Sequence, residues 1–435
     1  MANIPDSWST HDYCFPLDNS AVFTAAVFRR SSPSIFRISC ELDEIIYLPD
    51  LQAALVAVSD RFPFVLTGLR RGVFWYYLDP IQKPLRLYAD SQYPVRYRHS
   101  MRGGNYLFRV CVSGSRIACE FHHVLTDGTG ALEFLKALIA TYLTRRGIVC
   151  ADWGNIKKPG TEIKPEELAD AYAGVCDKKN PLPDPYPPAF HLPGKRYHGR
   201  EYRVVTGTLP LSTSLAVAKQ YGVSLTVLFA AVYIAALQDV YEVEACKNSR
   251  STRLMRPICL QIPVNMRRFH PSSTLRNFFL FTSVSFDTRQ GHFEFREILD
   301  RVHYLLKLNL TGRELDRQMR RNVRGEEYIF SRIVPLVIKN LVLRIVGRFA
   351  DDAPFSGALS NLQQVSMPKT FADHINRFDF ILPRKKIPGT NIAMISWRDT
   401  LSISVGSYIA DRSFERCFFT RCVELGIPVT VESNL

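Results

Sequence analysis

Eight prolines between residues 158 and 196 divide this chain into two parts of similar length. Proline fixes φ and has no N–H group, so neither a long helix nor a central strand can run through such a segment. One helical stretch, Glu166–Val175, is expected within it. We predict two domains for the 435 residues, 1–193 and 194–435. The prolines are Pro159, Pro165, Pro181, Pro183, Pro185, Pro187, Pro188 and Pro193.

The composition indicates a folded protein with a large core. Apolar residues make up 46% of the chain and charged residues 22%, which excludes a disordered chain, a collagen and a coiled coil. The net charge of +14 favours an anionic partner: a phosphate-bearing cofactor, a nucleic acid or a membrane surface. Charge alone does not choose among these three.

The cysteines and the apolar runs predict a cytoplasmic protein. Ten cysteines are scattered, form no CxxC pair and mostly have apolar neighbours, which favours reduced thiols over a zinc or disulfide framework. The N-terminus has no signal-peptide pattern, and the apolar run 224–237 is too short to span a bilayer. A basic amphipathic stretch, residues 333–350 with Lys339, Arg344 and Arg348, makes peripheral membrane contact an open alternative.

Both parts of the chain mix strands and helices without the regular alternation of a doubly wound sheet. This pattern predicts an α/β or α+β sandwich built twice. Strands are expected over 34–42, 73–78, 105–112, 115–123, 204–209, 256–264, 391–397, 401–408 and 429–431. Helices are expected over 51–61, 129–145 and 225–237 and from residue 411 to just before Gly426.

The segment Phe121–Gly130 carries the strongest signal for chemistry. Side chains alternate along a strand, so His123 shares a face with the apolar Ile117, Cys119 and Phe121, whereas His122 lies on the more polar face. An imidazole among apolar groups stays neutral and can act as a general base. Asp127 is placed to cap a helix or pair with a buried arginine. Gly128 and Gly130 permit a tight turn between strand and helix.

Residues 122–128 match the motif HHxxxDG and thereby resemble one superfamily. It includes chloramphenicol acetyltransferase, condensation domains of nonribosomal peptide synthetases, plant acyl-CoA-dependent acyltransferases and bacterial alcohol acetyltransferase-like proteins, the last being the most similar. Four fixed residues at this spacing arise by chance roughly once in a thousand such chains. The resemblance implies two acetyltransferase-like halves with the active-site tunnel between them.

Other segments are similar to elements of the same superfamily. Ser59–Pro63 resembles its "RHP" element, and Pro263–Arg267, followed by Asn277, resembles a strand and loop of its second half. Ser360–Leu362 resembles the "SNLG" segment near a crossing loop, expected at about residues 356–370, with Gln363 in place of the usual glycine. The plant DFGWG motif is absent: residues 377–381 read RFDFI.

The resemblance implies roles for individual residues. His123 would be the general base, without an acyl-enzyme, and His122 a structural member of the motif. Asp127 would be structural, paired with an arginine for which Arg61 is the candidate. Gly128 would keep the tunnel open for the pantetheine arm of the donor. Ser360 or Asn361 would donate a hydrogen bond to the tetrahedral oxyanion.

The sequence thus predicts an acyltransferase that uses a coenzyme A thioester and an alcohol. Two alternatives stay open: condensation of an acyl group bound to an acidic carrier protein with an amine or alcohol, and a non-catalytic homologue that acts as a binding or scaffold protein. No metal or permanently bound cofactor is expected, because adjacent strand histidines point to opposite faces and no HExxH motif occurs. The basic runs 313–324 and 384–386 are either a solvated face or contacts for coenzyme A phosphates or an acidic carrier; no nucleic-acid-binding motif accompanies them.

Overall fold

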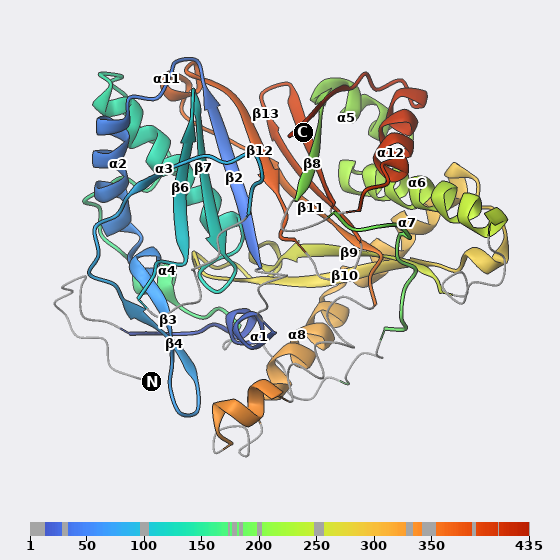
Figure 1. Cartoon of the computed structure of the whole chain (residues 1–435), viewed down its shortest axis with the longest axis horizontal. Helices are drawn as coiled ribbons and strands as arrows, with labels where there is room; N and C mark the ends of the chain where they lie inside the picture. Colours follow the sequence, from blue (N-terminus) through green and yellow to red (C-terminus); the bar gives the residue numbers. More distant parts are fainter. Residues whose placement is uncertain are drawn as a thin grey trace.

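The computed structural model describes most of the chain, with helices and strands arranged in two lobes (Figure 1). The described residues are 14–27, 34–95, 104–172, 175, 181, 186–197, 202–247, 256–327 (backbone only over 322–327), 334–341, 354–384, 389–407 and 409–434. The expected mixed α/β architecture is confirmed, because each lobe holds a sheet with helices packed on it. Of the basic run 384–386 only Arg384 is described, and of the stretch 333–350 only residues 334–341.

The strands form three sheets. The sheet of the first lobe has the order β12-β2-β7-β6-β5, that of the second lobe β10-β9-β11-β13-β14-β8-β15, and a small sheet β1-β4-β3 lies beside the first lobe. The strands are β1 (Phe15–Pro16), β2 (Ile35–Leu42), β3 (Thr67–Arg71), β4 (Tyr76–Pro80), β5 (Leu87–Ala89), β6 (Phe108–Ser113), β7 (Arg116–His122), β8 (Arg203–Pro210), β9 (Ile258–Asn265), β10 (Phe279–Phe286), β11 (Gly357–Gln364), β12 (Ile375–Ile381), β13 (Thr390–Trp397), β14 (Thr400–Ser407) and β15 (Thr430–Ser433).

The helices pack against the sheets through their apolar residues. They are α1 (Asn19–Val27), α2 (Leu48–Arg61), α3 (Gly128–Arg145), α4 (Pro165–Leu168), α5 (Leu211–Gln220), α6 (Leu225–Lys247), α7 (Phe295–Asn309), α8 (Gly312–Glu327), α11 (Lys369–Ala372) and α12 (Ser413–Glu424). Helices α2 and α3 lie beside the first sheet, and α5, α6 and α12 beside the second (Figure 1). One-turn 3₁₀ helices occur at Pro63–Leu66, Met266–Arg268 and Thr288–Gln290.

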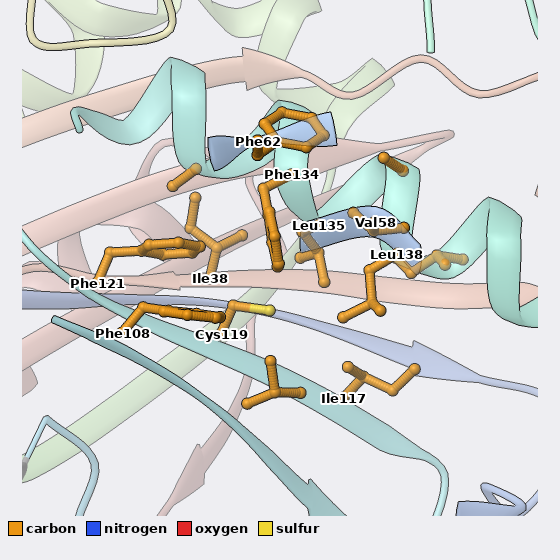
Figure 2. Packing of buried hydrophobic residues seen from close by; sticks show 14 of the residues in the cluster. Ile38, Val58, Phe62, Phe108, Ile117, Cys119, Phe121, Phe134, Leu135 and Leu138 are labelled. Atoms are coloured by element: carbon orange, nitrogen blue, oxygen red, sulfur yellow. The ribbon is translucent and has the colours of Figure 1, made fainter. Parts of the chain in front are cut away.

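An aromatic cluster joins α2 and α3 to the first sheet (Figure 2). Phe134 of α3 packs edge-to-face on Phe62, Phe108 and Phe121, with ring centroids 5.3, 5.6 and 5.5 Å away. Burial of one such phenylalanine contributes about 1.5–3 kcal/mol, so this cluster fixes α3 on the strand β7. The N-terminus of α3 and the C-terminus of β7 are thereby held together, and the HHxxxDG segment connects them.

Helix α6 forms the core of the second lobe. It packs against α7 and α12, and Leu228–Leu237 is fully or almost fully buried. Among the described residues, α6 is the one helix that is both long enough and apolar enough to cross a membrane. Of its apolar 18-residue stretch, 72% is buried inside the protein. It is thus longer than the run 224–237 that the sequence suggested, and it has the burial of a core helix.

The chain crosses between the two lobes after β11. Strand β11 lies in the second sheet, parallel to β9 and β13. The chain then passes through α11 to β12, which pairs antiparallel with β2 in the first sheet, with Phe378 opposite Cys40. The crossing loop expected at about 356–370 stays a prediction: residues 357–364 form β11, and the chain reaches β12 over residues 365–374. Strand β12, which follows residue 193 in the sequence, belongs to the sheet of the first lobe. The division of the chain at residue 193 therefore stays a prediction.

Most expected elements agree with the structure, and the exceptions have physical reasons. The helix expected over Glu166–Val175 is only the turn α4, because Ala169 is extended and Asp170 accepts a hydrogen bond from the Tyr172 N–H. Strands β1, β3, β5, β10, β11 and β12 and helices α1, α5, α7 and α11 were not expected from the sequence. In β10 the apolar Phe279 and Phe281 lie on the less buried face, and in β12 Asn376, Arg377 and Asp379 interrupt the apolar residues, so neither sequence alternates between apolar and polar residues.

Gln363 occupies a left-handed backbone conformation at the end of β11, with φ of 66°. Its N–H donates to Oδ1 of Asn361 at 2.7 Å, which stabilises this turn. A residue with a Cβ is disfavoured there by about 1–2 kcal/mol, whereas glycine is not. Gln363, which stands where the "SNLG" segment has glycine, therefore occupies a backbone conformation that favours glycine.

We expect Gln363→Gly to raise the free energy of unfolding by about 0.5–1 kcal/mol, because it removes this strain at a smaller cost in chain entropy. Urea unfolding followed by circular dichroism measures the change. Gln364→Gly is the matched control: its φ is not positive, and the substitution should lower stability by about 0.5–1 kcal/mol. Equal effects of the two substitutions would contradict the strain at Gln363.

Candidate active site

His123 lies at the C-terminal end of β7, where the two lobes meet. Its N–H donates to the Ser34 carbonyl at 3.0 Å, which continues the pairing of β7 with β2. Its ring centroid is 4.5 Å from that of Phe36 in the first lobe and 5.7 Å from that of Phe279 in the second. The imidazole is therefore held between one aromatic ring from each lobe, on the apolar side that the alternation predicted.

Burial keeps the His123 imidazole neutral. Loss of hydration lowers its pKa from 6.5 to about 4, although the charge of Asp127 and hydrogen bonding with the Asn277 side chain and the Thr126 main chain act in the opposite direction. The residue as a whole keeps some accessible surface. An imidazole that is neutral at pH 7 has the protonation state that a general base needs.

His122 points to the other side of the strand and is fully buried. Its Nδ1 accepts a hydrogen bond from the Val124 N–H at 3.1 Å, so the ring stabilises the turn that follows β7. Burial, and to a lesser extent His123, lowers the pKa of His122 to about 3. These contacts are those of a structural residue.

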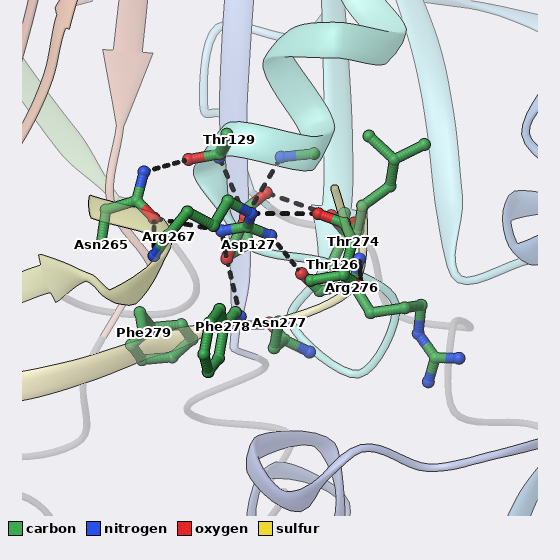
Figure 3. Close-up of polar contacts among 12 residues, drawn as sticks. Thr126, Asp127, Thr129, Asn265, Arg267, Thr274, Arg276, Asn277, Phe278 and Phe279 are labelled. Atoms are coloured by element: carbon green, nitrogen blue, oxygen red, sulfur yellow. Dashed lines mark hydrogen bonds and ion pairs between the residues drawn. The ribbon is translucent and has the colours of Figure 1, made fainter. Parts of the chain in front are cut away.

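Asp127 accepts four hydrogen bonds, two from each lobe (Figure 3). Oδ1 accepts the N–H groups of Thr129 and Gly130 at 3.1 Å each and so caps α3. Oδ2 accepts the Phe278 N–H at 2.9 Å and Nη1 of Arg267 at 2.7 Å, both from the second lobe. Both oxygens of the buried carboxylate thus accept two hydrogen bonds each, and the Arg267 guanidinium balances its charge.

Arg61 was wrong as the partner of Asp127: the partner is Arg267. The Arg61 guanidinium instead forms a two-pronged ion pair with Glu167, at 2.8 and 3.0 Å, and its Nε donates to Thr161 at 2.9 Å. Arg61 ends α2, so it fastens the proline-rich crossover to the first lobe. The sequence did offer one indication of Arg267, the similarity of Pro263–Arg267 to an element of the second half. A site between two lobes contains residues of both, so the arginine could be sought in that element.

Further hydrogen bonds enclose the loop between β7 and α3. Thr126 donates from Oγ1 to the Leu275 carbonyl at 2.6 Å, and Asn265 donates from Nδ2 to Oγ1 of Thr129 at 3.2 Å. Arg267 also donates to the carbonyls of Thr274 and Arg276, at 3.0 and 2.6 Å. Residues 265–279 of the second lobe thus form a frame around the motif (Figure 3).

The two glycines of the motif allow close approach of the second lobe. A Cβ on Gly130 would lie 2.1 Å from the Leu275 carbonyl oxygen, so no side chain fits there. A Cβ on Gly128 would lie 2.6 Å from Cδ2 of Leu362, beside the crossing segment. The space in front of Gly128 is therefore bounded by a flexible leucine, and its use by a pantetheine arm stays a prediction.

Asn361 and Ser360 lie in β11, on the second-lobe side. Nδ2 of Asn361 donates to Oγ1 of Thr226 at 3.2 Å, and its Oδ1 accepts the Gln363 N–H. Ser360 is mostly buried, opposite Ala393 of β13. In the described part of the chain no hydrogen bond joins either residue to His123, so a contribution to an oxyanion hole stays a prediction. No cluster of three or more His, Cys, Asp or Glu suited to a metal occurs among these described residues either.

No protein-family model and no curated protein matches this sequence. Solved structures match nearly its whole length. Polyketide synthase associated protein 5 from Mycobacterium tuberculosis has 14% sequence identity and a TM-score of 0.59, over 94% of this chain and 98% of its own. Trichothecene 15-O-acetyltransferase from Fusarium sporotrichioides has 12% identity and a TM-score of 0.60, over 97% and 96%.

A condensation domain is equally similar. The starter condensation domain of rhizomide synthetase, solved with C8-CoA and Leu-SNAC, has 11% identity and a TM-score of 0.57, over 95% of this chain and 94% of its own. At such identities the likeness concerns the fold. The chain therefore has the fold of the superfamily that its sequence resembles, that of chloramphenicol acetyltransferase and the condensation domains.

Proposed function

We propose that this protein transfers an acyl group from a coenzyme A thioester to an alcohol, with His123 as the general base. The observation that carries the proposal is the neutral His123 ring between Phe36 and Phe279, at the junction of the lobes. The solved neighbours include an O-acetyltransferase and a condensation domain bound to an acyl-CoA, which supports acyl transfer as the reaction class.

The reaction needs one base and a stabilised oxyanion. His123 takes the proton of the acceptor hydroxyl as its oxygen attacks the thioester carbonyl carbon. The tetrahedral intermediate collapses with cleavage of the C–S bond, and the imidazolium returns the proton to the thiolate, giving an ester and a free thiol. Asn361 or Ser360 donates to the oxyanion in this proposal, and no acyl-enzyme forms.

The basic run 313–324 within α8 supports a donor that carries negative charge. It holds five arginines against Glu314 and Asp316, and α8 lies at the bottom of the molecule, beside α1 and below β10 (Figure 1). Such a helix suits either coenzyme A phosphates or an acidic carrier protein, so condensation from a carrier thioester is the second candidate. Product formation with free acyl-CoA supports the first, and formation only with an acylated carrier protein supports the second.

We expect His123→Ala to lower kcat by roughly 10²-fold or more, because no base then takes the acceptor proton. Product formation from acetyl-CoA and a panel of alcohols and amines, measured by mass spectrometry, gives the rate. His292→Ala removes an exposed histidine paired with Glu242 and should leave the rate unchanged. An unchanged rate in His123→Ala would contradict the mechanism, and an unmodified protein inactive with every donor would favour the non-catalytic homologue.

The acid limb of the pH–rate profile should lie near pH 4, not near the usual histidine value of about 6.5. His123 loses its function only when protonated, and its lowered pKa delays protonation. We therefore expect kcat/KM at pH 5.5 to stay within about twofold of its value at pH 7.5. Unfolded His123 binds its proton at higher pH than the folded group, so acid also lowers stability, and circular dichroism must show that the protein is folded at each pH.

A cytoplasmic location with peripheral membrane contact completes the proposal. All nine cysteines among the described residues are free thiols, which suits a reducing compartment.

In the segment 334–341, Val337, Ile338 and Leu341 are 63%, 52% and 60% exposed. This segment rests on the turn between β3 and β4, where Lys339 donates to the Phe74 carbonyl at 2.9 Å. An apolar face beside a lysine suits an anionic bilayer surface.

We expect co-sedimentation of the protein with vesicles that contain phosphatidylglycerol, and less than half as much with Val337→Asp. Val149→Asp is the control, because Val149 is 85% exposed at a place remote in sequence from this segment. Equal binding of the two variants, or no binding of the unmodified protein, would contradict membrane contact through residues 334–341.

A further inference from the structure

Asn277 connects His123 to a buried carboxylate at the start of the chain. Its Nδ2 donates to the His123 carbonyl at 2.8 Å and to Oδ1 and Oδ2 of Asp18 at 3.2 and 3.0 Å. Its N–H also lies 3.4 Å from Oδ2 of Asp18. Asn277 is completely buried and Asp18 almost so, which makes each of these polar contacts costly to lose.

These partners determine which way the Asn277 amide points. At pH 7 the carboxylate of Asp18 and the carbonyl of His123 are both hydrogen-bond acceptors, so each needs the NH₂ end of the Asn277 amide. The opposite orientation would place the Oδ1 oxygen against three other oxygens. The amide is thus oriented by chemistry, and Oδ1 lies on the side away from Asp18.

Two buried atoms remain without a hydrogen bond of good geometry: Oδ1 of Asn277 and Nδ1 of His123. One is an acceptor, and the other is a donor when it carries the ring proton. The Asn277 amide already lies against His123, because its Nδ2 is 2.8 Å from the His123 carbonyl oxygen. Hydrogen bonding with the Asn277 side chain also raises the pKa of His123 against the effect of burial.

We propose that Asn277 is a positioning residue, whose Oδ1 accepts the Nδ1–H of His123 and leaves Nε2 as the proton-accepting nitrogen. The inference rests on the proposed function of His123 as the base. Nδ1 is buried whereas residue His123 as a whole keeps some accessible surface, so we assign Nε2 as the nitrogen that a substrate hydroxyl reaches. A ring protonated on Nε2 would place its lone pair on the inaccessible side.

Asp18 holds the Asn277 amide in place. Its Oδ1 also accepts the Ala21 N–H at 2.8 Å, and Nη2 of Arg276 lies 3.5 Å from its Oδ2. Burial raises the pKa of Asp18 to about 6, with Arg276 and Asn277 acting in the opposite direction and Asp170 adding to the rise. A protonated acid keeps a carbonyl oxygen that accepts from Nδ2, so the amide orientation survives down to pH 5.5.

The tautomer of His123 can be observed directly without substrate. In protein labelled with ¹⁵N-histidine, protonated and unprotonated ring nitrogens give well-separated signals, and His123→Gln identifies the His123 pair. We expect the Nδ1–H form in the unmodified protein and a loss of its dominance in Asn277→Ala. This readout is independent of activity, so it fails or succeeds separately from the proposed acyl transfer.

Kinetics supply the second readout. We expect Asn277→Ala to lower kcat on the order of 10- to 100-fold with KM changed less than about twofold, because Asn277 acts through His123 and not on the substrate. Asp18→Ala should have a smaller effect of the same kind, and Asp18→Asn should restore most of it, since an amide oxygen also accepts from Nδ2. Asn391→Ala is the control: Asn391 is another buried asparagine whose Nδ2 donates to a carbonyl, that of Pro383.

The outcomes separate positioning from structure. A folded Asn277→Ala that keeps the Nδ1–H form and the unmodified kcat overturns the proposal and leaves the Thr126 carbonyl as the acceptor. If Asn277→Ala does not fold, the Asp18 pair decides by the same two readouts. A shifted tautomer in Asn391→Ala as well would show that loss of stability alone moves the ring, and would also overturn it.

Discussion

The carboxylate of Asp127 is the interaction on which the rest of the site depends. It accepts two N–H groups at the start of α3 and, from the second lobe, an N–H group and a guanidinium. A buried charge with all its partners present is tolerated, and one that loses a partner is strongly destabilising. The same four bonds therefore cap a helix, dock the lobes and fix the loop that begins at His123.

The sequence predicted the fold class and the location of the site better than the contacts within it. Strand β7 and helix α3 were visible because alternation and helical spacing are local, and the HHxxxDG segment between them placed His123 among apolar groups. The partner of Asp127 was missed because Arg267 lies 140 residues away, and only the docking of the lobes brings the two together. Asp18 was missed for the same reason, and Asn277 was named only within a segment of the resemblance, without a role of its own.

The chemistry and the packing of this site are closely linked. The neutral state of His123 comes from burial, and burial comes from the second lobe, which supplies Phe279 and the frame of residues 265–279. An isolated first lobe would expose the ring and return its pKa toward the ordinary value. One side chain thus depends on both lobes: His123 lies between Phe36 of the first lobe and Phe279 of the second.

The position of β12 has a consequence for the order in which the protein folds. The first sheet is built from residues 35–122, but its edge strand is residues 375–381. During synthesis, β2 therefore exposes an unpaired edge until most of the second lobe has emerged from the ribosome. The pairing of β12 with β2 joins residues more than 300 positions apart, such as Phe378 and Cys40, so the sheet of the first lobe is completed late in folding. A chain that stops before residue 375 keeps the edge of β2 unpaired and open to association with other chains.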